Sequence, residues 1–156
     1  MPARAVRRGS VGLVTVLLLA GVLLSGTGPD RAGAGEITRR ERMLSLTNEV
    51  REQHRRADLR LNMRLSRYAK RHSLQMARAG HLFHSDTSVL TRALQPFHWS
   101  IGGENVGVGS SVESLQDAFM ASPTHRENIL RPSFDHTAIG MVRVGGRLWV
   151  TVVFYG

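Results

Sequence analysis

The sequence predicts an α+β domain in which several helices cover a small antiparallel sheet. Two segments before residue 80 repeat apolar side chains at helical spacing, whereas residues 137–155 are rich in the β-branched and aromatic residues typical of strands. A third observation is the short segment Gly102–Gly107, a further candidate strand. Because an isolated hairpin is marginal in water, the C-terminal strands need both this partner and a helical layer.

The first predicted helix starts near Ile37 and runs to about Arg55. Thr38-x-x-Glu41 has the pattern of a capping box, in which the hydroxyl and the carboxylate satisfy backbone donors at a helix start. The positions that follow at helical spacing are Met43, Leu46, Thr47 and Val50. The preceding Pro29–Gly35 is rich in Gly and Ala, and it is interpreted as a linker without regular structure.

A second helix is predicted between an N-cap at Asn62 and a stop at Gly80. One face of it would carry Leu65, Tyr68, Ala69, His72, Met76 and Ala79. A third helix would open at the capping box Ser110-x-x-Glu113. At Ser122-Pro123 a short helix restarts, with Ser as N-cap and Pro at the first helical position, and Arg131-Pro132 ends it.

The C-terminus changes from helical to strand periodicity. Thr137–Val144 and Arg147–Tyr155 are joined by the two residues Gly145-Gly146. Glycine adopts the positive φ angles of a tight hairpin turn without steric cost, so this pattern predicts a β-hairpin.

The N-terminus has the layout of an export signal. A basic start precedes the apolar run Val11–Leu24, and Ala32-Gly33-Ala34 offers small residues for cleavage. The run of about 14 residues is shorter than the ~20 that a membrane-spanning helix needs. We therefore divide the chain into a signal peptide, residues 1–34, and one domain, residues 35–156, of a secreted or envelope-associated protein. An uncleaved N-terminal anchor is the alternative.

Composition narrows the choice of partner and site. The chain has no cysteine, so disulfides, a thiolate nucleophile and cysteine-ligated zinc are excluded. Its formal charge is +9, and residues 35–156 keep +6 of it, mostly between Arg39 and Arg78. For an exported protein this excess favours phospholipid headgroups or anionic wall polymers, with a membrane surface as one such partner, over nucleic acid. Alternatively, the arginines only solvate the outer sides of two helices.

Four segments combine polar, titratable side chains with apolar neighbours. They are residues 82–85 (Leu-Phe-His-Ser), Gly103–Gly107, Ser122–Leu130 and, in the first helix, Asn48-x-x-Arg51. In this order, and followed by the terminal hairpin, they resemble the CAP superfamily, or SCP domain, of cysteine-rich secretory, antigen-five and pathogenesis-related proteins. The resemblance covers roughly residues 40–155 and is closest to the cysteine-free bacterial branch.

The resemblance implies a three-layer α-β-α sandwich with a shallow cleft. His84 and His125 match the two cleft histidines and Glu104 matches the glutamate of Gly-Glu-Asn. The sequence departs from the family at Phe119, where many relatives have Trp, and at Ser122, where they have an acid. Family members bind zinc or other divalent metals weakly through the two histidines, others bind sterols or fatty acids, and no single activity unites them.

The residues themselves also favour a site. Pro123 places His125 in a first helical turn, where the positive end of the helix dipole keeps the imidazole neutral. Glu104 could orient an imidazole or accept a proton from water. Alternatively, Glu104 only binds backbone amides of its turn and the imidazoles cap carbonyls. Asn48 and Arg51 are expected to tie the first helix to the sheet.

The other histidines are interpreted as surface or packing residues: His54, His72, His81, His98 and His136. His81 is the candidate exception. If a helix continued through residues 81–84, His81 and His84 would lie on the same helix face because they are three residues apart. No Gly-x-Ser-x-Gly motif supports a serine hydrolase, and no residue is assigned as catalytic.

The expected function is a monomeric, secreted binding module. Its cleft of His84, Glu104, His125 and Ser122 would take a lipid or an anionic envelope component without a required cofactor. Weak binding of zinc, or of another divalent cation, by His84 and His125 is a further expectation. Two alternatives remain: a metal-dependent hydrolase with Glu104 as general base, which is one metal ligand short, and a structural or signalling module that acts through its surface.

Overall fold

The computed structural model describes residues 29–156, and the predicted signal segment up to residue 28 lies outside the described residues. Over this range the elements are α1 (Pro29–Gln53), β1 (Arg60–Leu61), α2 (Met63–Ala79), α3 (Thr87–Leu94), β2 (Gly102–Gly109), α4 (Val112–Ala121), α5 (Pro123–Leu130), β3 (His136–Val144) and β4 (Arg147–Tyr155). No helix in this range is both long enough and apolar enough to cross a membrane. The division between residues 34 and 35 stays a prediction.

A four-stranded sheet in the order β1-β3-β4-β2 forms the middle layer. The predicted hairpin is confirmed, because β3 and β4 pair antiparallel and Gly145 and Gly146 take φ angles of 57° and 76°. β2 pairs antiparallel with the other side of β4, which confirms the candidate strand. β1, which the sequence did not indicate, adds a short parallel pairing to β3.

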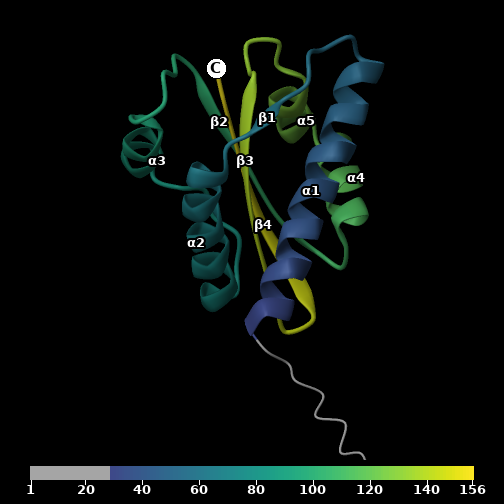
Figure 1. The fold of residues 1–156 in the computed structure, drawn as a ribbon, viewed down its shortest axis with the longest axis vertical. Coiled ribbons are helices and arrows are strands. Elements are labelled where there is room, and N and C mark those ends of the chain that lie inside the picture. Colours follow the sequence, from purple (N-terminus) through teal and green to yellow (C-terminus); the bar gives the residue numbers. More distant parts are fainter. Residues whose placement is uncertain (1–28) are drawn as a thin grey trace, which may run out of the picture.

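The three-layer α-β-α sandwich is confirmed. Figure 1 shows α2 and α3 on one side of the sheet and α1, α4 and α5 on the other. One apolar cluster packs the larger helical layer onto the sheet through Met43, Leu115, Phe119, Ile129 and Phe134, among others. Smaller clusters around Leu65, Ala69 and Met76 pack α2 onto the opposite face. Burial of this apolar surface is the main favourable term for the fold.

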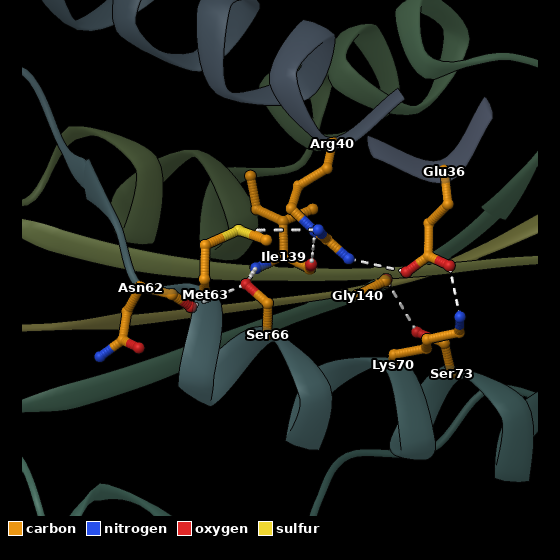
Figure 2. Close-up of polar contacts among 9 residues, drawn as sticks. All are labelled: Glu36, Arg40, Asn62, Met63, Ser66, Lys70, Ser73, Ile139 and Gly140. Carbon is orange, nitrogen blue, oxygen red and sulfur yellow. Dashed lines mark hydrogen bonds and ion pairs between the residues drawn. The ribbon is translucent and has the colours of Figure 1, made fainter. Parts of the chain in front are cut away.

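Helix α1 differs from its prediction at its N-terminal end. The Pro29–Gly35 segment is helical instead of a linker, and Thr38 lies inside the helix instead of capping it. A buried contact that composition does not reveal lies directly after this segment. Glu36 pairs with Arg40 of the same helix at 2.7 Å and with Lys70 of α2, and the contact with Lys70 anchors this part of α1 to a second helix (Figure 2).

Where β1 ends, side chains form hydrogen bonds with backbone groups on the unpaired edge of β3. β1 pairs only with His136 and Thr137. Beyond them, the Ile139 amide donates to the Ser66 hydroxyl at 3.1 Å, and Arg40 Nε donates to the Ile139 carbonyl at 2.8 Å (Figure 2). α1 and α2 thus satisfy backbone groups that a further strand would otherwise pair.

The predicted helix caps are partly confirmed. Asn62 Oδ1 accepts from the Leu65 amide at 2.9 Å and Gly80 takes the left-handed C-cap conformation. α4 is capped by Ser111 instead of Ser110, because the Ser111 hydroxyl reaches the Ser114 amide at 3.1 Å. Ser122 is the N-cap residue of α5, as predicted, although its side chain makes no capping hydrogen bond. Helix α3 was not anticipated.

Candidate functional site

Consecutive residues of β2 face opposite helical layers. A Cβ added to Gly102 would lie 2.9 Å from Leu94 of α3, whereas one added to Gly103 would lie 2.8 Å from Asn128 of α5. Since side chains alternate along a strand, Glu104 faces the α2–α3 side and Asn105 faces α5. β2 is an edge strand of the sheet, so both helical layers can approach each other beyond it.

Glu104 fixes the connection between α2 and α3. Its Oε1 accepts from the Ser85 amide at 2.8 Å and lies 3.0 Å from His84 Nδ1, while its Oε2 accepts from the Ser85 hydroxyl at 2.6 Å. The Glu104 side chain is only 4% exposed, whereas that of His84 is 60% exposed. The buried carboxylate therefore holds one edge of the His84 ring and leaves the ring accessible to solvent.

Asn105 performs the corresponding task on the other face. It is fully buried, and its Nδ2 donates to the His125 carbonyl at 3.0 Å. Its Oδ1 accepts from Asn128 Nδ2 at 2.9 Å, so both ends of the Asn105 amide are bound to α5. Two adjacent β2 side chains, those of Glu104 and Asn105, thereby anchor the segments that carry the two histidines.

His125 lies in the first turn of α5, as predicted. Its ring packs against Phe119 of α4 with the centroids 5.1 Å apart. Burial lowers the pKa of His125, and the nearby charge of His84 lowers it further. The two imidazoles, held on opposite sides of β2, are therefore within range of an electrostatic interaction.

Ser122 has a different environment from the three other predicted cleft residues. Its hydroxyl lies 3.3 Å from the Thr124 hydroxyl, and among the described residues it makes no hydrogen bond to His84, Glu104 or His125. Its part in the cleft stays a prediction.

Two cavities adjoin the His84 segment. One, of about 380 Å³, lies between α2 and the segment before α3, and the other, of about 360 Å³, lies between α3 and β2. His84 and Ser85 line both. The second cavity adds an apolar wall of Leu90, Leu94 and Trp99. The site thus combines an exposed imidazole with apolar surface, as small-molecule sites commonly do.

Arg51 and Asn48 connect α1 to α5 and to loop residues instead of to the strands of the sheet. The buried Arg51 guanidinium donates to the carbonyl oxygens of Ala57, Ile129, Arg131 and Phe134 at 2.7–3.2 Å. Asn48 bonds both backbone groups of Leu59, ahead of β1. The expected tie to the sheet is therefore corrected: these side chains position the chain around β1 and after α5.

The remaining histidines lie outside the Glu104 network. His81 does not continue α2, because the helix ends at Ala79, and its ring instead packs beside Phe83. His72 is buried and its Nε2 lies 2.9 Å from the Phe83 carbonyl, which agrees with a packing role. Sequence reasoning included Ser85 in the segment of residues 82–85 but did not predict that it binds the Glu104 carboxylate.

The residues of the site offer few free ligands for a metal ion. His84 and His125 offer two imidazoles, but both Glu104 oxygens are already engaged by Ser85 and His84. Within residues 29–156 no three histidine or carboxylate side chains are grouped to hold a metal. A catalytic zinc normally takes three protein ligands, so the residues present do not fit one.

Comparisons with known proteins agree with this architecture. Residues 44–154 match the model of CAP, the cysteine-rich secretory protein family. The Bacillus subtilis (strain 168) protein YkwD, described as uncharacterized, is 28% identical over 118 residues, which is 70% of this chain and 44% of the relative.

Solved structures show the same fold. An extracellular protein of Bacillus anthracis with an SCP domain superposes with a TM-score of 0.71 at 22% identity, over 82% of this chain and 43% of that one. An outer surface protein of Borrelia burgdorferi gives 0.67 at 15% identity, over 76% of this chain and 92% of that one. The chain thus spans less than half the length of the Bacillus subtilis and Bacillus anthracis relatives.

Proposed function

Because the chain belongs to the cysteine-rich secretory protein (CAP) family, we propose that it is an exported binding module for a lipid or anionic component of the cell envelope. The ligand would occupy the cavities beside His84. The observation that carries the proposal is the pairing of an exposed imidazole with the apolar wall formed by Leu90, Leu94 and Trp99. A ligand with one polar end and an apolar body suits these two kinds of surface.

The state of Glu104 supports binding over hydrolysis. A general base must be free to take a proton from water or substrate. Glu104 instead accepts two hydrogen bonds from Ser85 and contacts His84, and its side chain is nearly inaccessible. Its structural work is to fix the His84 segment, which suits a preformed binding surface.

Exposed apolar side chains at the cavity mouth also support a lipid-like ligand. Phe83 and Val89 line the cavity beside α2 and are 37% and 46% exposed, and the neighbouring Leu82 is 42% exposed. A cluster of large exposed apolar residues is uncommon away from a binding surface. The positive formal charge of the domain would favour ligands with anionic headgroups.

A matched pair of variants tests the cleft. Leu90→Gln places a polar group on the apolar wall, whereas Val144→Gln makes the same kind of change at an exposed position at the end of β3. We expect Leu90→Gln to weaken binding of a fluorescent long-chain fatty acid and of extracted envelope lipids, with Val144→Gln unchanged. Thermal melts would verify that both variants fold.

One result would contradict the proposed position of the ligand. If folded Leu90→Gln binds both probes as tightly as the unsubstituted protein, the apolar wall is not the ligand site. If the unsubstituted protein bound neither the fatty acid nor the envelope lipids more tightly than a neutral, non-lipid compound, the proposed function would be wrong.

The alternative of a metal-dependent hydrolase has less support from the structure. Its two ligands would be His84 and His125, and within the described residues no group of three histidine or carboxylate side chains could hold a metal. Two imidazoles alone would give weak zinc affinity. Titration calorimetry with zinc on the protein and on His125→Ala would expose such a site by a heat that the variant lacks.

A further inference from the structure

Four arginines surround a hollow between α2 and α3 that is separate from the apolar wall of the cleft. The hollow has a volume of about 250 Å³. α2 contributes Arg64, Arg67 and Arg71, and Arg92 reaches it from α3. The spacing of the α2 arginines, three and then four residues, places them on one face of the helix. Helices α2 and α3 therefore both contribute guanidinium groups to the lining of this hollow.

No acidic side chain neutralises this cluster. Within the described chain, none of the four guanidinium groups forms an ion pair, and no Asp or Glu lines the hollow. Other arginines do have carboxylate partners, such as Arg42 with Glu113 and Arg60 with Asp135. Four like charges around one small volume repel each other unless an anion joins them.

Aromatic groups give the hollow a defined shape. Tyr68 and Phe97 line it, and the guanidinium carbon of Arg64 lies 5.8 Å from the centre of the Phe97 ring. Stacking of this kind restricts an arginine side chain and orients its donors. A planar guanidinium then presents paired N–H groups that match two oxygens of one phosphate.

We propose that this hollow binds a phosphate group. The group could belong to a phospholipid headgroup or to a soluble phosphate ester, which share the same oxyanion chemistry. The site extends the proposed function by naming an anionic group, and Tyr68 and Arg71 line both this hollow and the cavity beside His84. Phosphate binding itself requires neither the apolar wall nor Glu104.

Two charge-matched double variants test the site. Arg67→Gln with Arg92→Gln removes one guanidinium from each helix that lines the hollow. Arg55→Gln with Arg78→Gln removes the same charge from exposed positions outside it. In an NMR titration of the purified protein with inorganic phosphate, we expect shifts concentrated at residues 64–71 and 92–97. The first pair should weaken binding at least about tenfold and the control pair should not.

Vesicles of phosphatidylglycerol separate the two sources of phosphate. If the headgroup is the ligand, the first pair lowers sedimentation with the vesicles more than the control pair. If the first pair loses binding of inorganic phosphate but sediments with the vesicles as the control pair does, the site is retained and its ligand is a soluble phosphate ester. Equal losses from both pairs in both assays would show diffuse attraction and overturn the site. Because the fatty-acid assay contains no phosphate, failure of the apolar cleft would be seen separately.

Discussion

Ser85 binds both oxygens of the Glu104 carboxylate, with its backbone amide on Oε1 and its hydroxyl on Oε2. These two bonds place the residue after His84 directly against an edge strand of the sheet. A loop that carries an exposed side chain would otherwise be free to move. The geometry of the His84 side of the cleft therefore depends on one buried acid.

Removal of the Glu104 carboxylate is expected to destabilise the fold and loosen the His84 loop. Hydrogen bonds to a charged acceptor are stronger than neutral ones, so Glu104→Ala should lower the free energy of unfolding by about 2–4 kcal/mol. Glu104→Gln keeps one oxygen acceptor and should lose about half as much. Chemical denaturation measures both values, and amide hydrogen exchange at Ser85 reports the loop.

Glu127→Gln is the control for Glu104, because Glu127 is exposed and, among residues 29–156, its one ion-pair partner is Arg131. Its effect should stay below about 0.5 kcal/mol. An unfolding free energy of Glu104→Ala equal to that of this control would contradict a structural role for the buried carboxylate.

The coupling between the two histidines gives a spectroscopic prediction. The pKa of His125 is lowered first by burial and second by the charge of His84. His84→Gln removes the second cause, so the pKa of His125 should rise toward its ordinary value. His81→Gln, which alters an exposed ring outside this coupling, should leave the pKa of His125 unchanged. Titration of the imidazole resonances by NMR measures both, and equal pKa values in all three proteins would place the rings apart.

The same shift has a consequence for stability. The folded pKa of His125 lies below the ordinary value of 6.5, so the unfolded chain takes up this proton first as pH falls. The contribution of His125 to stability is therefore complete above that value. As the pH falls from 6.5 through the lower pKa of the folded state, this contribution to stability is lost. His125→Gln should flatten this part of the stability profile, and a profile that keeps its slope would assign the effect to other groups.

Local signals in the sequence were sufficient for several elements. The Gly145-Gly146 turn specifies a hairpin because two positive φ angles are needed at adjacent positions, and Asn62 and Gly80 specify the ends of α2 through their own geometry. His84, Glu104 and His125 could be named from motifs. The donors around Glu104 could not be named, since Ser85 acts through its backbone amide as well as its hydroxyl.

Long-range contacts account for most of the errors. Helix α1 begins before its predicted start near Ile37, and next to that start Glu36 pairs with Lys70, 34 residues away in the sequence. β1 has two residues and takes its place from backbone bonds to the chain around Asp135 and Thr137, so no periodicity could reveal it. Arg51 was expected at the sheet, but its acceptors are carbonyls of α5 and of loop residues that come together only in the folded chain.

Arg51 is predicted to be among the most sensitive positions of the helical layer. It is fully buried, and burial, more than the neighbouring Arg56, lowers the pKa of its guanidinium. Arg51→Met leaves several buried carbonyls without donors and should lower the free energy of unfolding by about 3–5 kcal/mol.

Arg51→Lys should recover little of this loss, because an ammonium group lacks the planar fork that reaches separate carbonyls. Arg55→Lys, at an exposed position, controls for the change of residue type. Denaturant midpoints compare the variants, and full stability of Arg51→Lys would show that charge matters here more than geometry.

Gly140 marks the closest approach of α2 to the sheet. A Cβ at this position would lie 1.9 Å from the Lys70 amide nitrogen and 2.1 Å from the Ala69 carbonyl carbon, so the helix backbone itself would have to move. Gly140→Ala should therefore lower the free energy of unfolding by more than about 3 kcal/mol or prevent folding.

Gly146→Ala is the matched control. It adds the same methyl group at a φ of 76° with nothing within 4 Å, so backbone strain alone should lower the free energy of unfolding by about 1–2 kcal/mol. Melting temperatures measured side by side should fall further for Gly140→Ala, since a helix displaced from β3 loses the Ser66 and Ser73 contacts together. Equal melting temperatures for the two variants would mean that α2 does not lie directly on β3.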